Sequence, residues 1–308
     1  MPSPDSEAIL IQKSTIDCLK NELGWETAYA FRSEALDIPA NHGFSTFGRK
    51  SYKEVVLTRY FRAALQKLNP WMTAAQMDEA QKRLESRLST ASAMEINEEK
   101  YRLIRDGIPV TVKKPGGRQE TRLAAVIDFK HPQENHFLAI EELNIDGPLY
   151  HRRADIVGFV NGLPLLFVEL KKHDVDVENA YTDNYQDYLD TIPQLFYYNA
   201  FVMLSNGVDA KIGTLGSKYA FFHEWKRLKE DEVGCVALET MLRGVCRKEN
   251  FLDLFENFIL FDHSEGKTVK ILARNHQYLG VNEAVKAYHA RKLKDGRLGQ
   301  GKGEEHHG

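Results

Sequence analysis

Apolar residues recur at helical spacing in three early segments of the chain, residues 6–23, 51–68 and 73–90. The pattern changes between residues 100 and 150, where short apolar runs alternate with turn sequences, which is typical of strands. A polar helix is predicted over 176–190 and a strand near 200, and apolar stripes at helical spacing return over 222–260. This order of elements predicts an α/β or α+β domain with a helical appendage.

The composition narrows the possible functions only modestly. The chain has 308 residues and a net charge of −3, so whole-molecule attraction cannot draw it to nucleic acid. Any DNA-binding surface must therefore be a local patch. The three cysteines lack paired spacing, which argues against a zinc site or a disulfide framework and fits a reducing cytoplasm. We find no signal peptide and no run of 18 apolar residues, so we expect a cytoplasmic protein.

The most informative stretch is RRADIVGFVNGLPLLFVELKK, residues 152–172, where two apolar runs flank an Asn-Gly turn and predict a β-hairpin. Asp155, Glu169 and Lys171 interrupt these runs, although a buried strand rarely carries charges unless they are paired or bind something. Two carboxylates on neighbouring strands suit Mg²⁺, and Lys171 shares a strand face with Glu169 because side chains alternate. This set is suited to metal-assisted phosphodiester hydrolysis. The alternative is an exposed edge hairpin with a surface salt bridge between Glu169 and Lys171.

The register of this hairpin decides whether the two acids meet. A plain two-residue loop at Asn161-Gly162 would place Asp155 opposite Val168, on the face away from Glu169. A three-residue loop, or a bulge with Gly162 in the left-handed conformation, places Asp155 directly opposite Glu169. We therefore predict an odd or bulged connection at Asn161-Gly162.

The hairpin sequence resembles the nuclease motif of the R subunit of type I restriction enzymes, whose N-terminal domain has a PD-(D/E)xK endonuclease fold. The resemblance continues along the chain, in order, through SEAILIQKSTIDCLKNELGW, LQKLNP, NHFLAIEELNIDG, IPQLFYYNAFVMLSNG and ILARNHQYLGVNEAVKA. It implies a mixed central sheet flanked by helices, with an endonuclease domain over 1–225 and a helical linker over 226–290 as the C-terminal helical appendage. Residues 291–308 are Gly-rich and charged, and we expect a flexible or expression-derived tail there.

The resemblance implies Asp155, Glu169 and Lys171 as the catalytic set, with Asp155 and Glu169 as the ligands of Mg²⁺. Ala154 stands where the family has a proline, a change that costs backbone stiffness but no metal ligand.

A Gln-x-x-x-Tyr element characteristic of this nuclease branch should lie on the helix after the hairpin. At that place the chain has Asn184 and Tyr188, four residues apart on one helix face, as a supporting and a catalytic candidate respectively. The alternative for Tyr188 is a core tyrosine whose hydroxyl is hydrogen-bonded. Gln194 and Tyr198 also match the Gln-x-x-x-Tyr spacing but lie beyond Pro193, so we rank them second.

Basic residues near the hairpin are candidates for contacts with the DNA backbone. Arg152 and Arg153 come shortly before the first acid, Asp155. Lys113 and Lys114 lie on an expected loop, and we interpret them as solvent-exposed charges without a DNA contact. The resemblance further implies double-stranded DNA as the substrate, and the methylation (M) and specificity (S) subunits of a restriction complex as partners.

The family's R subunits continue into an ATP-driven motor. The GQGKG sequence at 299–303 lacks the Ser or Thr and the preceding strand of a complete phosphate-binding loop, so we expect no complete ATPase site here. ATP would then act only through a motor region missing from this chain. For Gln277, near the segment that leads into the motor, a helix-capping or linker role is preferred over adenine recognition.

Two other functions stay open for this chain. One is a stand-alone repair or junction-resolving nuclease of the same fold, and the other is a non-catalytic docking module of a translocase complex.

Overall fold

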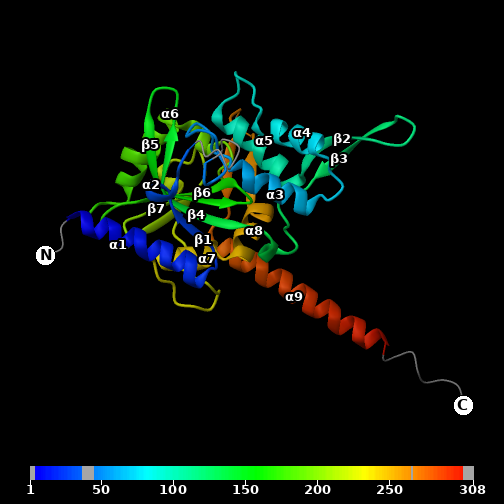
Figure 1. The fold of residues 1–308 in the computed structure, drawn as a ribbon. Coiled ribbons are helices and arrows are strands. Elements are labelled where there is room, and N and C mark those ends of the chain that lie inside the picture. Colours follow the sequence, from blue (N-terminus) through cyan, green and yellow to red (C-terminus); the bar gives the residue numbers. More distant parts are fainter. Residues whose placement is uncertain (1–3, 37–44, 265, 301–308) are drawn as a thin grey trace, which may run out of the picture.

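The computed structural model describes residues 4–36, 45–264 and 266–300, and its centre is a six-stranded mixed sheet (Figure 1). The strands lie side by side in the order β1 (Glu26–Tyr29), β4 (Phe137–Asp146), β5 (His151–Val160), β6 (Leu163–Leu170), β7 (Phe201–Ser205) and β8 (Ala210–Gly213). The β1–β4 and β6–β7 pairs are parallel, and the other neighbours are antiparallel. The sequence prediction of a mixed sheet flanked by helices is confirmed.

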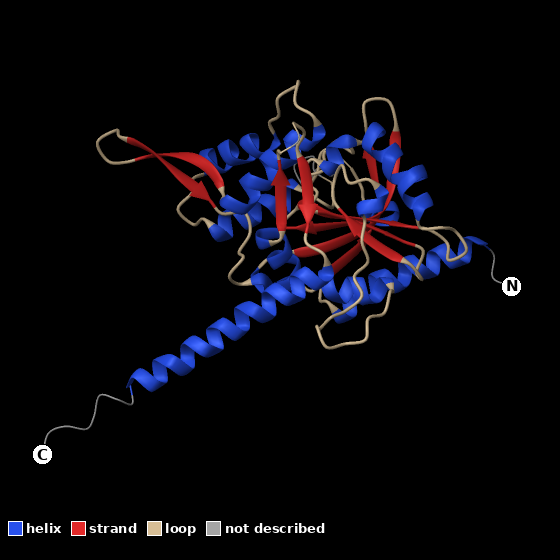
Figure 2. Cartoon of the chain, turned by 180° about the vertical axis from the view of Figure 1, so that it is seen from behind, coloured by secondary structure: helices blue, strands red, loops and turns tan. Residues whose placement is uncertain are grey.

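Helices cover both faces of this sheet, as Figures 1 and 2 show from opposite sides. They are α1 (Pro4–Asp17), α2 (Ala30–Ser33), α3 (Thr58–Leu68), α4 (Ala74–Glu85), α5 (Ala93–Asp106), α6 (Gln186–Thr191), α7 (Leu238–Val245), α8 (Lys248–Asn257) and α9 (Asn275–Gln300). On one face, Phe167 of β6 packs against Tyr188 of α6 with ring centroids 5.8 Å apart. On the other, Phe201 of β7 packs against Phe251 of α8 at 5.1 Å. The two faces are therefore closed by segments from different parts of the chain.

Strand β6 lies at the centre of this arrangement and is buried along its whole length, from Leu163 to Leu170. It has a strand partner on each side and a helical layer on each face, which explains why its sequence is a nearly continuous apolar run. An exposed edge hairpin, the alternative considered for this stretch, is thus excluded. The burial also means that Glu169 sits inside the protein.

Several elements differ from the sequence prediction. Helix α3 begins at Thr58 instead of residue 51, and residues 222–237 contain no helix. Helix α5 and strands β1 and β8 were missed, as was the hairpin of β9 (Ile259–Asp262) and β10 (Val269–Leu272) inside the expected helical linker. These strands have four residues each, too few to establish a period of two.

Two parts of the molecule project from this core in Figures 1 and 2. The first is a separate two-stranded hairpin of β2 (Ile108–Lys113) and β3 (Gln119–Ala124). The second is α9, which continues to Gln300 through the first part of the expected tail, because its Ala, Lys, Arg and Leu residues favour helix. Residues 301–308 lie outside the described part of the chain. No helix among the described residues has the length and apolar character needed to cross a membrane.

Candidate active site

The β5–β6 hairpin brings Asp155 and Glu169 to one face of the central sheet. Ile156 pairs with Val168 across the two strands. The next position toward the open end of the hairpin therefore sets Asp155 opposite Glu169. The predicted cross-strand register of the two acids is confirmed.

The place of the register shift, however, was predicted wrongly. Asn161 and Gly162 form a regular two-residue turn with φ values of 50° and 80°, since Asn-Gly readily adopts two left-handed conformations. The shift comes further along β6, where Leu165 is the extra residue of a bulge. Pro164 beside it has no N–H to give to the ladder, which favours a bulge at this point. The carbonyl of Leu165 accepts a hydrogen bond from the N–H of Ala200 at 2.7 Å, so the bulge is held by the segment that leads into β7.

The two carboxylates differ in the hydrogen bonds that their oxygens accept. Asp155 Oδ2 accepts a hydrogen bond from the backbone N–H of Leu170 at 2.8 Å. Glu169 is only 1% exposed, and its Oε2 is buried without a hydrogen-bond partner in the described structure. A buried carboxylate oxygen without a partner costs free energy, which makes Glu169 Oε2 a candidate acceptor for a bound group.

Burial and mutual repulsion raise the pKa of both acids. Burial raises the pKa of Asp155 from 3.8 to about 6, an effect opposed by the Leu170 N–H and increased by the nearby carboxylate of Glu142. Burial raises the pKa of Glu169 well above its ordinary value, and the charge of Asp155 raises it further. A bound cation would reverse this, because it favours the charged form of both groups.

Lys171 supplies positive charge beside the acids. Its ammonium lowers the pKa of both Asp155 and Glu169, and its Nζ donates a hydrogen bond to Oδ1 of Asn184. Asn184 lies in a π-helical segment, Ala180–Tyr185, that leads directly into α6. Asn184 therefore contacts the lysine side chain directly, and its supporting role stays a prediction.

Tyr188 lies close to the acids but is held by the backbone. Its hydroxyl donates to the carbonyl oxygen of Arg153 at 3.0 Å, and only 7% of the residue is exposed. Burial raises the pKa of its phenol, and the carboxylates of Glu169 and Asp155 raise it further. The hydrogen bond to the Arg153 carbonyl links Tyr188 to the strand that carries Asp155, as expected of a residue that positions this strand, and a catalytic role for its hydroxyl stays a prediction.

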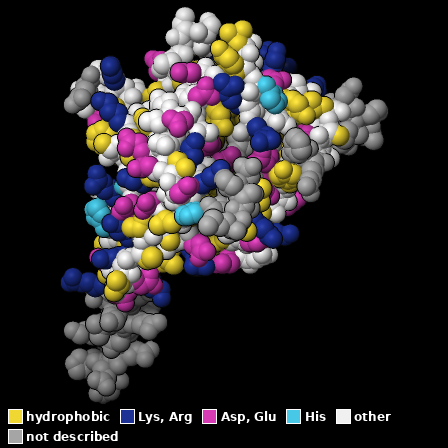
Figure 3. All heavy atoms as spheres, turned by 90° about the vertical axis from the view of Figure 1, so that its left-hand side faces the viewer, with side chains coloured by type: hydrophobic (Ala, Val, Ile, Leu, Met, Phe, Trp, Pro, Cys, Tyr) yellow, Lys and Arg dark blue, Asp and Glu magenta, His cyan; other side chains and the backbone are white. Residues whose placement is uncertain are grey.

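The two arginines before Asp155 are both paired within the chain. Arg152 makes a bidentate contact with Asp187 of α6, at 2.6 and 3.0 Å. Arg153 forms an ion pair with Glu142 of β4, a residue that the sequence analysis did not single out. Figure 3 shows Lys and Arg side chains interspersed with Asp and Glu on the face of the molecule at the left of Figure 1. The charges of Arg152 and Arg153 are thus partly neutralised by carboxylates of the same chain.

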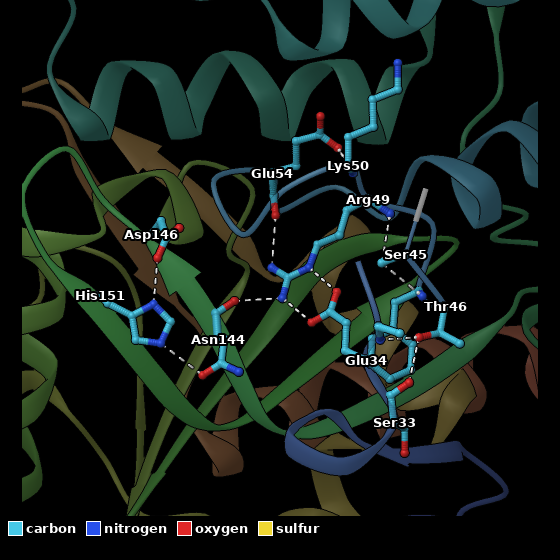
Figure 4. Close-up of polar contacts among 12 residues, drawn as sticks. Ser33, Glu34, Ser45, Thr46, Arg49, Lys50, Glu54, Asn144, Asp146 and His151 are labelled. Carbon is cyan, nitrogen blue, oxygen red and sulfur yellow. Dashed lines mark hydrogen bonds and ion pairs between the residues drawn. The ribbon is translucent and has the colours of Figure 1, made fainter. Parts of the chain in front are cut away.

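A buried ion pair anchors the same part of β4 (Figure 4). Arg49 contacts both carboxylate oxygens of Glu34, at 2.6 and 2.5 Å, and both side chains are fully buried. The guanidinium also donates to the carbonyl oxygen of Asn144 at 2.7 Å. The Asn144 side chain in turn contacts His151, which pairs with Asp146 at 2.6 Å. The network joins the N-terminal segment to both strands of the β4–β5 hairpin, close to Glu142 and Asp155.

The available ligands fit a hard cation that keeps several waters. Among the described residues, no three His, Cys, Asp or Glu side chains are grouped closely enough to hold a metal ion between them. The carboxylates of Asp155 and Glu169 provide two oxygen ligands, and Glu169 Oε2 has an unused acceptor. Mg²⁺ is commonly bound by one or two carboxylates with water completing its octahedron, so the donor set is suitable.

Comparison with known proteins assigns this chain to a family. Residues 4–221 match the family described as type I restriction enzyme R protein N terminus. The chain belongs to this family. It is 34% identical over 285 residues to the type I restriction enzyme HindI endonuclease subunit of Haemophilus influenzae, covering 89% of this chain and 26% of that protein. It is 29% identical over 113 residues to the SsaAORF53P endonuclease subunit of Staphylococcus saprophyticus, covering 37% of this chain and 12% of that protein.

This chain spans only about a quarter of the length of the HindI subunit. Gln194, the second-ranked candidate, donates to the carbonyl oxygen of Asp146 at 2.8 Å and so contacts the end of β4. Gln277 accepts from the N–H of Arg274 at 2.8 Å at the start of α9, which confirms the preferred helix-capping role. Most of the GQGKG sequence lies outside the described residues.

Proposed function

We propose that this chain is a DNA-cleaving module that hydrolyses phosphodiester bonds of double-stranded DNA with Mg²⁺ as its cofactor. The observation that carries the proposal is the side-by-side placement of Asp155 and Glu169, with a buried carboxylate oxygen that has no partner. Lys171 beside the pair adds the positive charge that a phosphate substrate needs. Membership of a restriction enzyme family supports the same reading.

Each residue has a separate task in this proposal. Asp155 and Glu169 would hold the cation, which polarises the phosphoryl oxygen and lowers the pKa of a bound water. Lys171 would attract the scissile phosphate and orient the attacking water, while Asn184 keeps the ammonium in place. Tyr188 would fix the backbone at Arg153 and hence the position of Asp155. None of these groups reads a base, so cleavage by this module would not depend on sequence.

We infer that partners supply the DNA. The net charge of −3 and the intrachain pairing of Arg152 and Arg153 favour weak, salt-sensitive DNA binding by the chain alone. The names of the relatives describe subunits of type I restriction enzymes, so we propose M and S subunits as the partners, acting in the cytoplasm. ATP would be used by a motor region outside this chain.

The test combines DNA cleavage with metal binding. Excess protein is incubated with supercoiled plasmid in Mg²⁺ or EDTA, and cation affinity is measured by calorimetric titration with Mn²⁺. Asp155→Asn and Glu169→Gln should abolish both nicking and cation binding, Lys171→Met should abolish nicking alone, and Lys172→Met serves as the control. Nicking that survives Asp155→Asn would disprove the assigned site. Parent protein that binds no cation would favour the docking-module alternative instead.

A further inference from the structure

A third acid, Glu142, lies beside the two acids of the hairpin. Strand β4 pairs Glu141 with Ile156 and Leu143 with Ala154 on β5. Glu142 therefore occupies the position opposite Asp155, just as Glu169 does on the other side. Three neighbouring strands thus each contribute one carboxylate at the same level of the sheet.

The backbone at Glu142 is unusual for a residue within a strand. Its φ is 55°, one of two positive φ values among the described residues other than glycine. The second belongs to Asn161, where a tight turn requires it and where asparagine tolerates it. Glutamate has no such tolerance, and no turn lies at position 142, so the conformation costs free energy that glycine would avoid. Strain of this kind is often found where a side chain has to be placed for function.

The charge at this position is also unfavourable without a cation. The Glu142 carboxylate raises the pKa of both Asp155 and Glu169, so it destabilises the ionised pair. Arg153 offsets part of this cost through its ion pair with Glu142, and its side chain is 53% exposed. Meanwhile Glu169 Oε2 remains buried without a partner on the far side of Asp155. A cation between the strands would relieve all three carboxylates together.

Building on the proposed function, we propose that Glu142 is a positioning residue of the cation site, which accepts a hydrogen bond from a water bound to the cation. We do not assign Glu142 a direct bond to the cation, because no three acids among the described residues are grouped closely enough to share one metal ion. Partners in this outer position orient the bound water and raise cation affinity, and their loss commonly weakens binding 10–100-fold. Arg153 neutralises Glu142 when no cation is bound.

The experiment measures Mn²⁺ affinity by calorimetry and thermal stability in EDTA, neither of which requires cleavage. Glu142→Gln keeps the size of the side chain and should weaken Mn²⁺ binding about tenfold. Glu142→Gly should weaken it similarly, while its melting temperature in EDTA equals or exceeds that of the parent, since glycine accepts a positive φ. Glu141→Gln is the matched control: Glu141 is the neighbouring acid, bonded to Gln12 at 3.2 Å, and its substitution should leave Mn²⁺ affinity unchanged.

Asp155→Asn separates failure of this inference from failure of the proposed function. If Asp155→Asn abolishes Mn²⁺ binding while Glu142→Gln behaves like Glu141→Gln, the cation site stands and Glu142 is only the ion-pair partner of Arg153. If Asp155→Asn retains parental affinity, the proposed function itself fails. A lower melting temperature for Glu142→Gly together with unchanged Mn²⁺ affinity for Glu142→Gln would likewise assign Glu142 a structural role and overturn the inference.

Discussion

Replacing Asp155 with asparagine should stabilise the cation-free protein. The folded structure raises the pKa of this carboxyl from 3.8 to about 6, chiefly through burial. Above that pH the folded protein contains an ionised carboxylate whose free energy would be lower in the solvated, unfolded chain. A difference of about 2 pKa units corresponds to about 3 kcal/mol of lost stability. Asparagine has a similar shape, carries no charge, and keeps an oxygen that can accept the Leu170 N–H.

The pH dependence gives this prediction its sign. Between pH 4 and 6 the folded protein binds more protons at Asp155 than the unfolded chain does, so the free energy of unfolding falls as pH rises. Above the folded pKa of about 6 the loss is complete and constant. The stability advantage of Asp155→Asn should therefore be about 0.5 kcal/mol near pH 4 and grow to about 3 kcal/mol at pH 8. For a chain of 308 residues this corresponds to a rise in melting temperature of about 5 °C at pH 8.

The assay is thermal unfolding in EDTA, followed by circular dichroism at several pH values, with Asp190→Asn as a control because Asp190 is exposed on α6. Saturating Mg²⁺ should reverse the order, since it stabilises the parent by mass action and has no complete site in the variant. An Asp155→Asn protein that is less stable than the parent at pH 8, or whose advantage does not change with pH, would refute the account of the acid pair.

Three further predictions concern the residues that hold the site in place. Arg49→Met should cost about 3–5 kcal/mol in chemical denaturation, because it leaves the buried Glu34 carboxylate without its partner, and Arg49→Met/Glu34→Leu should recover much of that loss. Gly162→Ala should lower the melting temperature, since a Cβ there would lie 2.6 Å from a backbone oxygen and φ is 80°; unchanged stability would contradict this packing. Tyr188→Phe should cost about 1 kcal/mol by removing the hydrogen bond to the Arg153 carbonyl, and a loss of nicking as large as that of Lys171→Met would instead show a chemical role for the hydroxyl.

The sequence was most informative where local and long-range preferences agree. The β5–β6 hairpin combines an Asn-Gly turn with two apolar runs, and α4 begins at Thr73 with a capping box completed by Gln76. Such signals depend on neighbouring residues, so they can be recognised without knowledge of the fold. Helix α5 carried an equally clear signal in Ser92 and Glu95, which form a second capping box, and it could have been predicted in the same way.

Other features depend on contacts that no local pattern reveals. Glu142 was missed because it directly follows another acid, Glu141, and the sequence does not show which of the two faces the hairpin acids. Its importance appears only when β4 pairs with β5 and brings it opposite Asp155. The burial of Arg49 was equally hidden, because its partner Glu34 lies 15 residues earlier in a segment with no periodic pattern. In both cases the decisive fact is which distant residue becomes a neighbour.

The bulge at Leu165 shows how one residue links local backbone chemistry to function. A tight Asn-Gly turn alone would send Asp155 and Glu169 to opposite faces of the sheet. Pro164 cannot donate to the ladder, and the extra residue beside it moves the rest of β6 by one position. Every side chain beyond that point then changes face, so Glu169 and Lys171 arrive on the side occupied by Asp155. The carbonyl of Leu165 is held by Ala200 of the adjacent chain segment, which prevents the strand from slipping back. The meeting of the two acids is therefore a property of the backbone, and substitutions of the acids themselves should leave it intact.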